Sequence, residues 1–502
     1  MSRSPFSSAA AALAAVAAVQ HAAATIASLP RAVKGDGFLS IPIGRMDRPL
    51  SLGTPAQSIS VLLDTGSSDL WVSPTCTPMP GLSSVSTCDA FGSYVPSRSR
   101  SVQGPVGQEV IEYGDPTEPS TQTSVTLSYF ADDLTIAGAT IKNQIFGVMT
   151  EGEQPGIAGI FGLAPDLRGF DKGKPYSLVL NSMVEEGIIK SRAFSLDLRH
   201  AESETGAVIY GGLDVKKFAG KLAKFPLQPG LSGEARLAVS LSTVGTTRSR
   251  RTVHPVPPAS AVAVLDSGTT LTRLSPSLAR PILQELGASV DTEGFFVAPC
   301  SIRRTSATVD FGFGTPGEDP GVTLRVRASD FVLDLPHLSD QNLCYVGLRV
   351  TDHQQILGDS VLRGGYFVFD WDNEEVHVAP AANCGSEVVA IGTGSGAVPN
   401  VEGKCSLDDN GPQITDSPTA TINDGSLPTD AFTTTYTITE CPAFDRQCTV
   451  GAVTTKTFIP LKTGDATDSN DDDDGAASGR GGLLDIWLAL ATTVGGVYML
   501  LR

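Results

Sequence analysis

The feature that most constrains this 502-residue chain is a short motif that occurs twice. Residues 61–68 read Val-Leu-Leu-Asp-Thr-Gly-Ser-Ser, and residues 263–270 read Ala-Val-Leu-Asp-Ser-Gly-Thr-Thr. Each copy has an apolar stretch, one aspartate, a hydroxyl residue, a glycine and two more hydroxyl residues. The two aspartates, Asp64 and Asp266, are 202 positions apart. A repeat at this distance predicts two similar halves with the same local structure.

A second shared element follows each motif. Ile160-Phe161-Gly162 comes 98 residues after Asp64, and Ile356-Leu357-Gly358 comes 92 residues after Asp266. Stretches of Val, Leu and Ile favour buried strands, and an aspartate at the end of such a strand is partly desolvated. The sequence therefore predicts that each half offers one carboxylate at the end of a buried strand.

Two such carboxylates, brought together by approximate symmetry, do not both ionise easily, so one keeps its proton while the other is charged. The pair can hold a water molecule, whose proton passes to the charged aspartate while the neutral one polarises a carbonyl. We therefore interpret Asp64 and Asp266 as a catalytic pair for direct attack of water on an amide. The residues expected to support the pair are glycines that allow close backbone approach and hydroxyl residues that orient the carboxylates: Gly66, Gly268, Thr65, Ser67, Ser267 and Thr269.

From Gly37 to Cys384 the chain resembles the pepsin-like aspartic proteases, most clearly in Asp64–Val72 and Ile356–Asp359. The resemblance implies an all-β, bilobal fold with a few short helices and with the cleft between pseudo-twofold-related lobes. We expect the lobes to span residues 37–203 and 204–384. The resemblance also implies an endopeptidase that cleaves peptides and proteins at acid pH without a cofactor or metal, and we expect it to be a monomer.

The family's flap is a hairpin whose tyrosine closes over the substrate, and Tyr113-Gly114 matches it in position. By the same resemblance, Trp71 is the hydrogen-bonding partner of Tyr113. Asp115 is expected near the pocket for the residue before the cut, where a carboxylate attracts Lys or Arg, with Glu112 and Glu118 adding to the field. A solvated residue at the hairpin tip is the alternative for Asp115.

The chain has eight cysteines, an even number, and no Cys-x-x-Cys pair. By their resemblance to family disulfides, we expect Cys76 to pair with Cys88 and Cys300 with Cys344. The connectivity of the rest is not readable from sequence. Pairing of Cys384 with Cys405, where the catalytic part meets the following segment, and of Cys441 with Cys448 inside that segment, are hypotheses.

Both ends of the chain resemble targeting signals. Residues 1–24 predict a secretory signal peptide, and residues 25–36 a short pro or linker segment. Residues 385–475, rich in Ser, Thr and Asp, predict an extended stalk that carries O-linked sugars. Residues 476–502 fit a glycolipid (GPI) anchor signal, with Gly475 as the expected attachment residue and Ser478 as the alternative.

An anchor of this kind would hold the protein outside the plasma membrane or in the cell wall. The C-terminal segment, residues 476–502, and the sequence Asp266-Ser267-Gly268-Thr269-Thr270 together are most similar to the fungal yapsin-like members of the family. A single transmembrane span is the alternative for the tail. The uninterrupted apolar run, residues 486–501, is shorter than the roughly 20 residues that a span needs, which favours the anchor.

Charge and motifs exclude other classes. The formal net charge of −18 argues against a nucleic-acid binder, which needs a basic surface. The six histidines are scattered without a His-Glu-x-x-His motif, so a metalloprotease has no support. A surface protein that kept the fold and lost activity is the rival function, and the intact aspartate motifs argue against it. Arg250-Arg251 resembles a processing site, with a solvated basic loop as the alternative.

Overall fold

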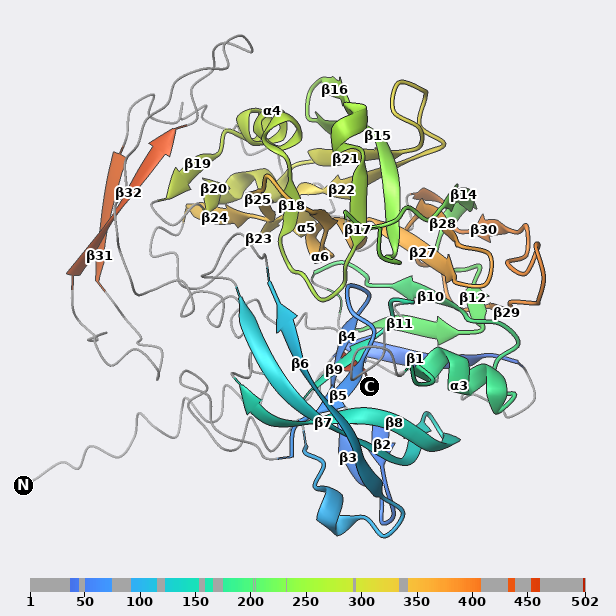
Figure 1. The fold of residues 1–502 in the computed structure, drawn as a ribbon. Coiled ribbons are helices and arrows are strands. Elements are labelled where there is room, and N and C mark those ends of the chain that lie inside the picture. Colours follow the sequence, from blue (N-terminus) through green and yellow to red (C-terminus); the bar gives the residue numbers. More distant parts are fainter. Residues whose placement is uncertain are drawn as a thin grey trace, which may run out of the picture. The chain divides into compact units, whose positions relative to one another are not determined.

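The fold comes from a computed structural model of the chain. It describes residues 37–44, 50–74, 92–114, 122–152, 159–165, 175–201, 203, 205–231, 233–291, 295–333, 342–407, 432–437, 453–460 and 500–501 (Figure 1). Helices are few and short in this part: α3 (Val179–Glu185), α4 (Pro276–Leu286), α5 (Ala328–Phe331) and α6 (Asp359–Leu362), with 3-10 turns at Pro96–Arg98, Pro258–Ser260 and Cys300–Arg304. The expectation of an all-β fold with a few short helices is confirmed.

The strands of the first half are β1 (Leu39–Gly44), β2 (Leu50–Leu52), β3 (Gln57–Ile59), β4 (Leu62–Asp64), β5 (Leu70–Val72), β6 (Gln103–Tyr113), β7 (Thr123–Ile136), β8 (Ala139–Gly152), β9 (Gly159–Gly162) and β10 (Ala193–Asp197). The long hairpin β7–β8 turns at Ala137 and Gly138, both with positive φ, as a two-residue hairpin turn requires. It pairs with β6 on one side and β5 on the other.

The strands of the second half are β11 (Thr205–Tyr210), β12 (Gly212–Asp214), β13 (Ala219–Lys221), β14 (Ala223–Pro226), β15 (Ala238–Thr247), β16 (Arg251–Pro255), β17 (Val262–Leu265), β18 (Thr272–Leu274), β19 (Ser289–Asp291), β20 (Phe296–Pro299), β21 (Thr308–Phe313), β22 (Val322–Arg327), β23 (Val332–Leu333), β24 (Leu343–Val346), β25 (Leu348–Val350), β26 (Gln355–Leu357), β27 (Gly365–Asp370) and β28 (Glu375–Pro380).

A central antiparallel sheet joins the two halves. It is the part of a larger sheet with the strand order β14-β28-β27-β10-β11-β1, so strands from the middle and the end of the catalytic region lie beside the first strand (Figure 1). All six residues of β27 are buried, and Phe369 stacks on Phe194 of β10 with ring centroids 4.9 Å apart. Burial on both faces explains why β27 has no polar alternation.

The two motif copies occupy equivalent places in their sheets. In the first half, β4 pairs with β9 in parallel, and β9 pairs with β5 in antiparallel. In the second half, β17 pairs with β26 in parallel, and β26 pairs with β18 in antiparallel. The two shared sequence elements are therefore neighbouring strands, and each half repeats the same local arrangement.

The ordered catalytic part extends beyond Cys384, where we expected the stalk to begin. Strand β29 (Val388–Ala390) pairs with β12, and β30 (Glu402–Lys404) pairs with β13. Ile391 is fully buried against the central sheet, in a cluster with Tyr366 and Val368. A boundary at 384/385 is therefore wrong for this part of the fold. Its apolar residues bury a sheet face, whereas the Ser/Thr-rich composition starts only after Cys405.

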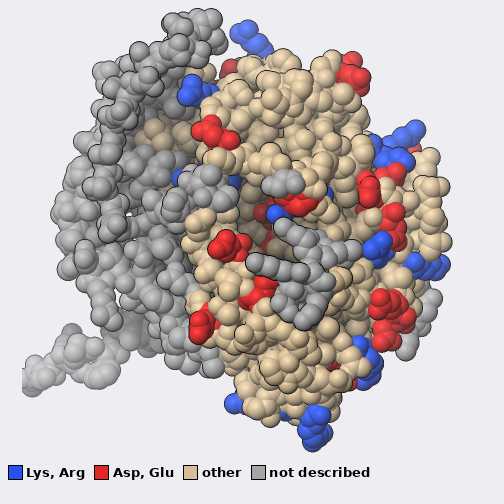
Figure 2. All heavy atoms as spheres, in the orientation of Figure 1, with Lys and Arg blue, Asp and Glu red and all other residues tan. Residues whose placement is uncertain are grey.

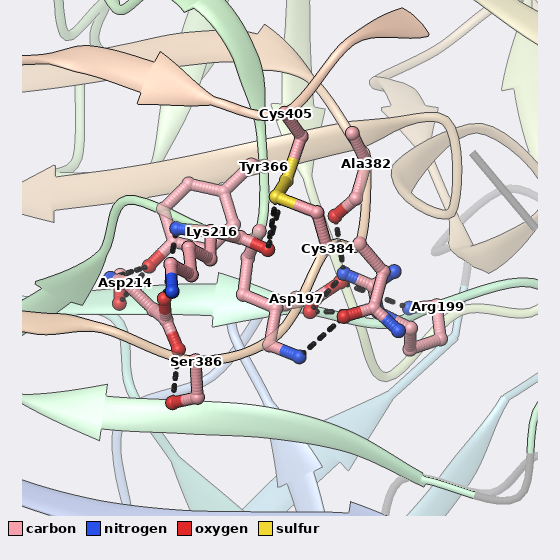
Figure 3. Close-up of polar contacts among 12 residues, drawn as sticks. Asp197, Arg199, Asp214, Lys216, Tyr366, Ala382, Cys384, Ser386 and Cys405 are labelled. Atoms are coloured by element: carbon pink, nitrogen blue, oxygen red, sulfur yellow. Dashed lines mark hydrogen bonds and ion pairs between the residues drawn. A yellow bond between two sulfur atoms is a disulfide. The ribbon is translucent and has the colours of Figure 1, made fainter. Parts of the chain in front are cut away.

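A disulfide and two hydrogen bonds to the Asp214 carboxylate hold this extension in place (Figure 3). Cys384 and Cys405 form a disulfide that closes a loop of sequence separation 21. The Asp214 carboxylate accepts hydrogen bonds from the Ser386 hydroxyl (2.6 Å) and from the Glu387 backbone N–H (2.8 Å). The hypothesis that Cys384 and Cys405 pair is confirmed.

Three further strands belong to the region after Leu407. Strands β31 (Phe432–Thr437) and β32 (Val453–Pro460) form a hairpin that pairs with β19, inside the segment for which we expected an extended stalk. Strand β33 (Leu500–Leu501) pairs with β1 and β4. Residues 1–24 and 25–36, for which we expect a signal peptide and a linker, lie outside the described residues, as do Gly475, Cys441 and Cys448. No helix within the described ranges is long and apolar enough to cross a membrane.

Candidate active site

The catalytic pair predicted from the repeat lies at the ends of two buried strands. Asp64 ends β4, and Asp266 directly follows β17. Both side chains are almost fully buried, with relative exposures of 6% and 9%. Each carboxylate accepts one backbone and one hydroxyl hydrogen bond from its own motif. Asp64 receives Gly66 N–H (2.8 Å) and the Ser67 hydroxyl.

The second carboxylate repeats these contacts in the other half. Asp266 accepts the Gly268 N–H at 2.8 Å and the Thr269 hydroxyl at 2.6 Å. In both halves the backbone bond goes to Oδ1 and the hydroxyl bond to Oδ2. The two carboxylates are therefore oriented in matching ways by residues that the sequence pattern had singled out.

Thr65 and Ser267 tie the two motifs to each other. The Thr65 hydroxyl donates to the Leu265 carbonyl (2.7 Å), and the Ser267 hydroxyl donates to the Leu63 carbonyl (2.9 Å). Each hydroxyl oxygen also accepts the backbone N–H of the other residue, at 2.9 and 3.1 Å. This reciprocal set of four buried bonds fixes the distance between the halves at the catalytic pair.

Gly66 and Gly268 are required because a side chain at either position would collide with the opposing carboxylate, not because of their backbone angles. A Cβ on Gly66 would lie 2.5 Å from Asp266 Cγ, and a Cβ on Gly268 would lie 2.4 Å from Asp64 Oδ1. The glycines of the second shared element have the same reason. A Cβ on Gly162 would lie 2.4 Å from the Ser68 carbonyl carbon, and one on Gly358 would lie 2.3 Å from the Thr269 oxygen.

The electrostatics of the pair follow from this closeness. Burial and the neighbouring charge of Asp266 raise the pKa of the Asp64 carboxyl well above its usual range. Two carboxyls that share one desolvated site retain a proton between them. One neutral and one charged carboxyl supply an acid and a base in the same place, as hydrolysis by water requires.

The hydrogen bond between Trp71 and Tyr113 that the family resemblance implies is present. Trp71 Nε1 donates to the Tyr113 hydroxyl over 2.7 Å, which holds the last residue of β6 beside the catalytic loop. Gly114, with φ of 100°, follows at the exposed end of the strand. Burial raises the pKa of Tyr113, so its hydroxyl stays protonated. Asp115 and Glu118 lie outside the described residues.

The alternation of β6 changes which acid faces the site. Glu112, which we expect from the sequence to add to the field of Asp115, is exposed on the face opposite Tyr113. Glu109 shares the inner face with Tyr113 and acts electrostatically on Tyr129 and on Tyr176. Side chains alternate between the two faces of a strand, so the spacing from Tyr113 distinguishes Glu109 from Glu112 in the sequence itself.

Other site residues were also missed. Asp69 accepts hydrogen bonds from the hydroxyls of Tyr129 (3.1 Å) and Tyr176, which fix the chain five residues beyond Asp64. Asp359 is buried within electrostatic reach of Asp266. Arg363 Nη2 donates a hydrogen bond to Asp359 Oδ2 over 3.4 Å. The only sequence signal for Asp359 was its place directly after Ile356-Leu357-Gly358.

Cys300 and Cys344 form a disulfide, as expected, and Cys76 and Cys88 lie outside the described residues.

Residues 248–250 form the exposed tip of the β15–β16 hairpin. Thr247 pairs there with Arg251, and the Arg248 N–H donates to the Arg250 carbonyl over 3.2 Å. This tight turn favours the basic loop over an extended processing site.

Charged side chains of both signs are interspersed on the face of the molecule in Figure 2. Within the described ranges, no cluster of three or more His, Cys, Asp or Glu residues has the arrangement to hold a metal ion.

The chain is similar to known proteins over most of its length. Residues 48–381 match the family described as eukaryotic aspartyl protease. A probable aspartic-type endopeptidase (opsB) of Aspergillus oryzae is 31% identical over 391 residues, which are 75% of each chain. Secreted aspartic protease 5 of Candida albicans is 32% identical over 353 residues, which are 68% of this chain and 78% of that one.

A solved structure supports the fold. The aspartic proteinase from Irpex lacteus superposes with a TM-score of 0.53 over 68% of this chain and 97% of its own, at 19% identity. At that identity the likeness shows the architecture alone. The match over residues 48–381 and the two relatives above 30% identity carry the assignment. The chain belongs to the eukaryotic aspartyl protease family and is an aspartic-type endopeptidase.

Proposed function

We propose that this endopeptidase cleaves peptide bonds at acid pH by direct attack of a water molecule held between Asp64 and Asp266. The observation that carries the proposal is the matched set of bonds around two buried carboxyls that are tied together by Thr65 and Ser267. The structure of the pair supplies one proton donor and one proton acceptor without any covalent intermediate.

In the first step the charged carboxylate takes a proton from the water as its oxygen bonds to the carbonyl carbon. The neutral carboxyl gives its proton to the carbonyl oxygen, which leaves a neutral tetrahedral diol and a pair still sharing one proton. Collapse of the diol breaks the C–N bond, with one proton returned to the pair and one delivered to the leaving nitrogen. The pair thus ends in its starting protonation state.

The flap residues have a supporting role in this proposal. Tyr113, held by Trp71, closes over the bound peptide and limits the access of bulk water to the carboxyl pair. A drier site strengthens each hydrogen bond and charge interaction in it. The protonated Tyr113 hydroxyl accepts the Trp71 N–H and keeps its own hydrogen for donation.

We further propose that the enzyme accepts Lys or Arg before the scissile bond. Support comes from the acids carried by the flap: Asp115 from the sequence pattern, and Glu109 from its position on the inner face of β6. Matched peptides with Lys, Arg or Leu at this position test it. Asp115→Ser and Glu109→Gln should lower the relative rate on the basic peptides, and Glu112→Gln serves as the exposed control. Unchanged ratios in both the Asp115→Ser and the Glu109→Gln enzyme would refute the proposal.

The location of the enzyme is proposed from its ends. Residues 1–24 would direct the chain into the secretory pathway, in line with a relative named as secreted, and residues 476–502 would be exchanged for a glycolipid anchor. Release from intact cells by a phosphoinositide-specific phospholipase is the expected result, with mass spectrometry placing the glycolipid on Gly475. Retention after the treatment would favour a transmembrane span.

Activity itself separates the enzyme from the rival function, a catalytically silent surface protein. The secreted catalytic region should hydrolyse an unfolded protein substrate at pH 3–5, and pepstatin should block it. Asp64→Asn should fold, as judged by circular dichroism, and show no hydrolysis. Equal, pepstatin-insensitive hydrolysis by the variant would mean that the measured activity comes from another protein.

A further inference from the structure

Arg236 connects the second half of the chain to the catalytic loop of the first. It lies between β14 and β15, directly before Leu237, whose carbonyl accepts the Leu265 N–H at 2.8 Å beside Asp266. The Nη1 atom of Arg236 donates to the carbonyl oxygen of Gly66 over 2.6 Å. The guanidinium therefore sits at a loop that touches both members of the catalytic pair.

The position of this side chain is fixed rather than accidental. Glu234 Oε1 accepts the Arg236 Nε–H at 3.3 Å, and the Glu234 side chain lies over Gly230, where an added Cβ would be 2.2 Å from that oxygen. The backbone closes the same loop, because the Gly230 N–H donates to the Glu234 carbonyl at 2.8 Å. A guanidinium anchored at two atoms loses little further freedom when it binds a third group.

Arg236 also retains the capacity to bind more. Its side chain is 31% exposed, in contrast to the nearly buried carboxyl pair. The contacts to Gly66 and Glu234 use two N–H donors, and a guanidinium carries five. A peptide that lies across Asp64 and Asp266 passes the Gly66 loop, so its side chains come within reach of the remaining donors.

We propose that Arg236 is a specificity-determining residue, which favours substrates that carry a carboxylate close to the scissile bond. A guanidinium pairs with a carboxylate through parallel, charge-assisted hydrogen bonds. Arginine stays charged at every pH at which the enzyme works, whereas a glutamate in a peptide ionises near pH 4.3. The preference therefore grows as the pH rises through the titration of the substrate acid. The proposal depends on the endopeptidase mechanism of Asp64 and Asp266.

The test uses pairs of fluorogenic peptides that differ by one residue, Glu or its neutral isostere Gln, placed in turn at each of the three positions on either side of the cut. The ratio of kcat/KM for Glu over Gln is measured between pH 3 and pH 6. At one position the wild-type ratio should rise to about five or more by pH 6. Arg236→Met should bring that ratio to one, and Arg236→Lys should keep part of it.

A matched control is Arg325→Met, because Arg325 is exposed on β22 opposite Asp310 of β21 and should leave the ratio as in the wild type. A wild-type ratio near one at every position and pH would overturn the proposal. So would an Arg236→Met enzyme that is slower on both peptides equally, which would make Arg236 a positioning residue only. If Arg236→Met does not fold, Arg236→Lys and the wild-type pH dependence decide. Absence of any pepstatin-sensitive cleavage would instead refute the mechanism.

Discussion

Leu163 and Asp359 occupy equivalent places in the two halves, each directly after the glycine of the second shared element. The Leu163 N–H donates to the Asp64 carbonyl at 2.7 Å, and the Asp359 N–H donates to the Thr269 carbonyl at 2.9 Å. Both side chains are buried. The backbone bonds each of them to a catalytic loop, yet one half places a hydrocarbon there and the other an acid.

The acid makes the second half electrically different. Burial raises the pKa of Asp359 to about 7, Arg363 opposes the shift and the charge of Asp266 adds to it. Asp359 Oδ1 has no hydrogen-bond partner among the described residues. Equivalent places in the sequence repeat therefore do not impose equal electrostatics. The flap is a second asymmetry, because the Trp71–Tyr113 contact stands beside the Asp64 loop.

The largest expected effect tests whether the two halves are equal in catalysis. Asp64→Asn and Asp266→Asn should each lower kcat/KM about a thousandfold or more, because either change removes the shared proton chemistry. Pepstatin-sensitive peptide hydrolysis at pH 4 is the measurement, with circular dichroism to show folding. A variant that keeps a tenth of the activity would show that one half alone can drive the reaction.

Gly66→Ala and Gly268→Ala should have the second-largest effect on activity. Each added methyl group would collide with the carboxylate of the opposite half, so kcat should fall about a hundredfold through misplacement of the pair. Gly396→Ala is the control, since a Cβ there meets nothing within 4 Å. Equal losses of kcat would show that the two halves depend on close packing to the same degree. A loss confined to one variant would show that they do not.

Asp359→Asn should change the pH dependence of stability. The carboxyl titrates at 3.8 when unfolded and at about 7 when folded, so the folded state holds the proton more tightly. The wild type therefore loses stability as the pH rises between these values, by on the order of 4 kcal/mol, and the neutral Asn variant does not.

Differential scanning fluorimetry from pH 3 to pH 8 measures this effect. The two proteins should melt at similar temperatures at pH 3, and the Asn variant should melt higher at pH 8. Asp352→Asn, an exposed acid of the same half, should follow the wild type. Parallel curves for wild type and Asp359→Asn would mean that the buried acid does not distinguish the halves.

The smallest effect concerns the flap. Tyr113→Phe keeps the ring and removes the hydroxyl that accepts the Trp71 N–H, so kcat/KM should fall about fivefold. Trp71→Phe, which removes the donor, should give a similar loss, and the double variant should lose little more, since both changes delete one hydrogen bond. Additive losses would contradict the role of this bond.

Much of the site could be predicted from the sequence because catalysis and close packing restrict residue types locally. The glycines 66 and 268 leave room for the opposing carboxylates, and the hydroxyl residues follow the aspartates at fixed spacing. Arg236 was not predicted because its contact with Gly66 spans 170 residues and has no local pattern. The extension from Ser386 to Cys405 was missed because its packing partners lie on the central sheet.

The sequence by itself determined the two carboxylates, the two halves and the family, since these depend on repeated short motifs whose chemistry is visible residue by residue. Only the tertiary structure decided the surroundings of the acids: Asp359 is buried within electrostatic reach of Asp266, Glu109 shares a strand face with Tyr113 and Glu112 faces solvent. The reason is physical. Charge interactions depend on distance and burial, and both arise from contacts between segments that are far apart along the chain.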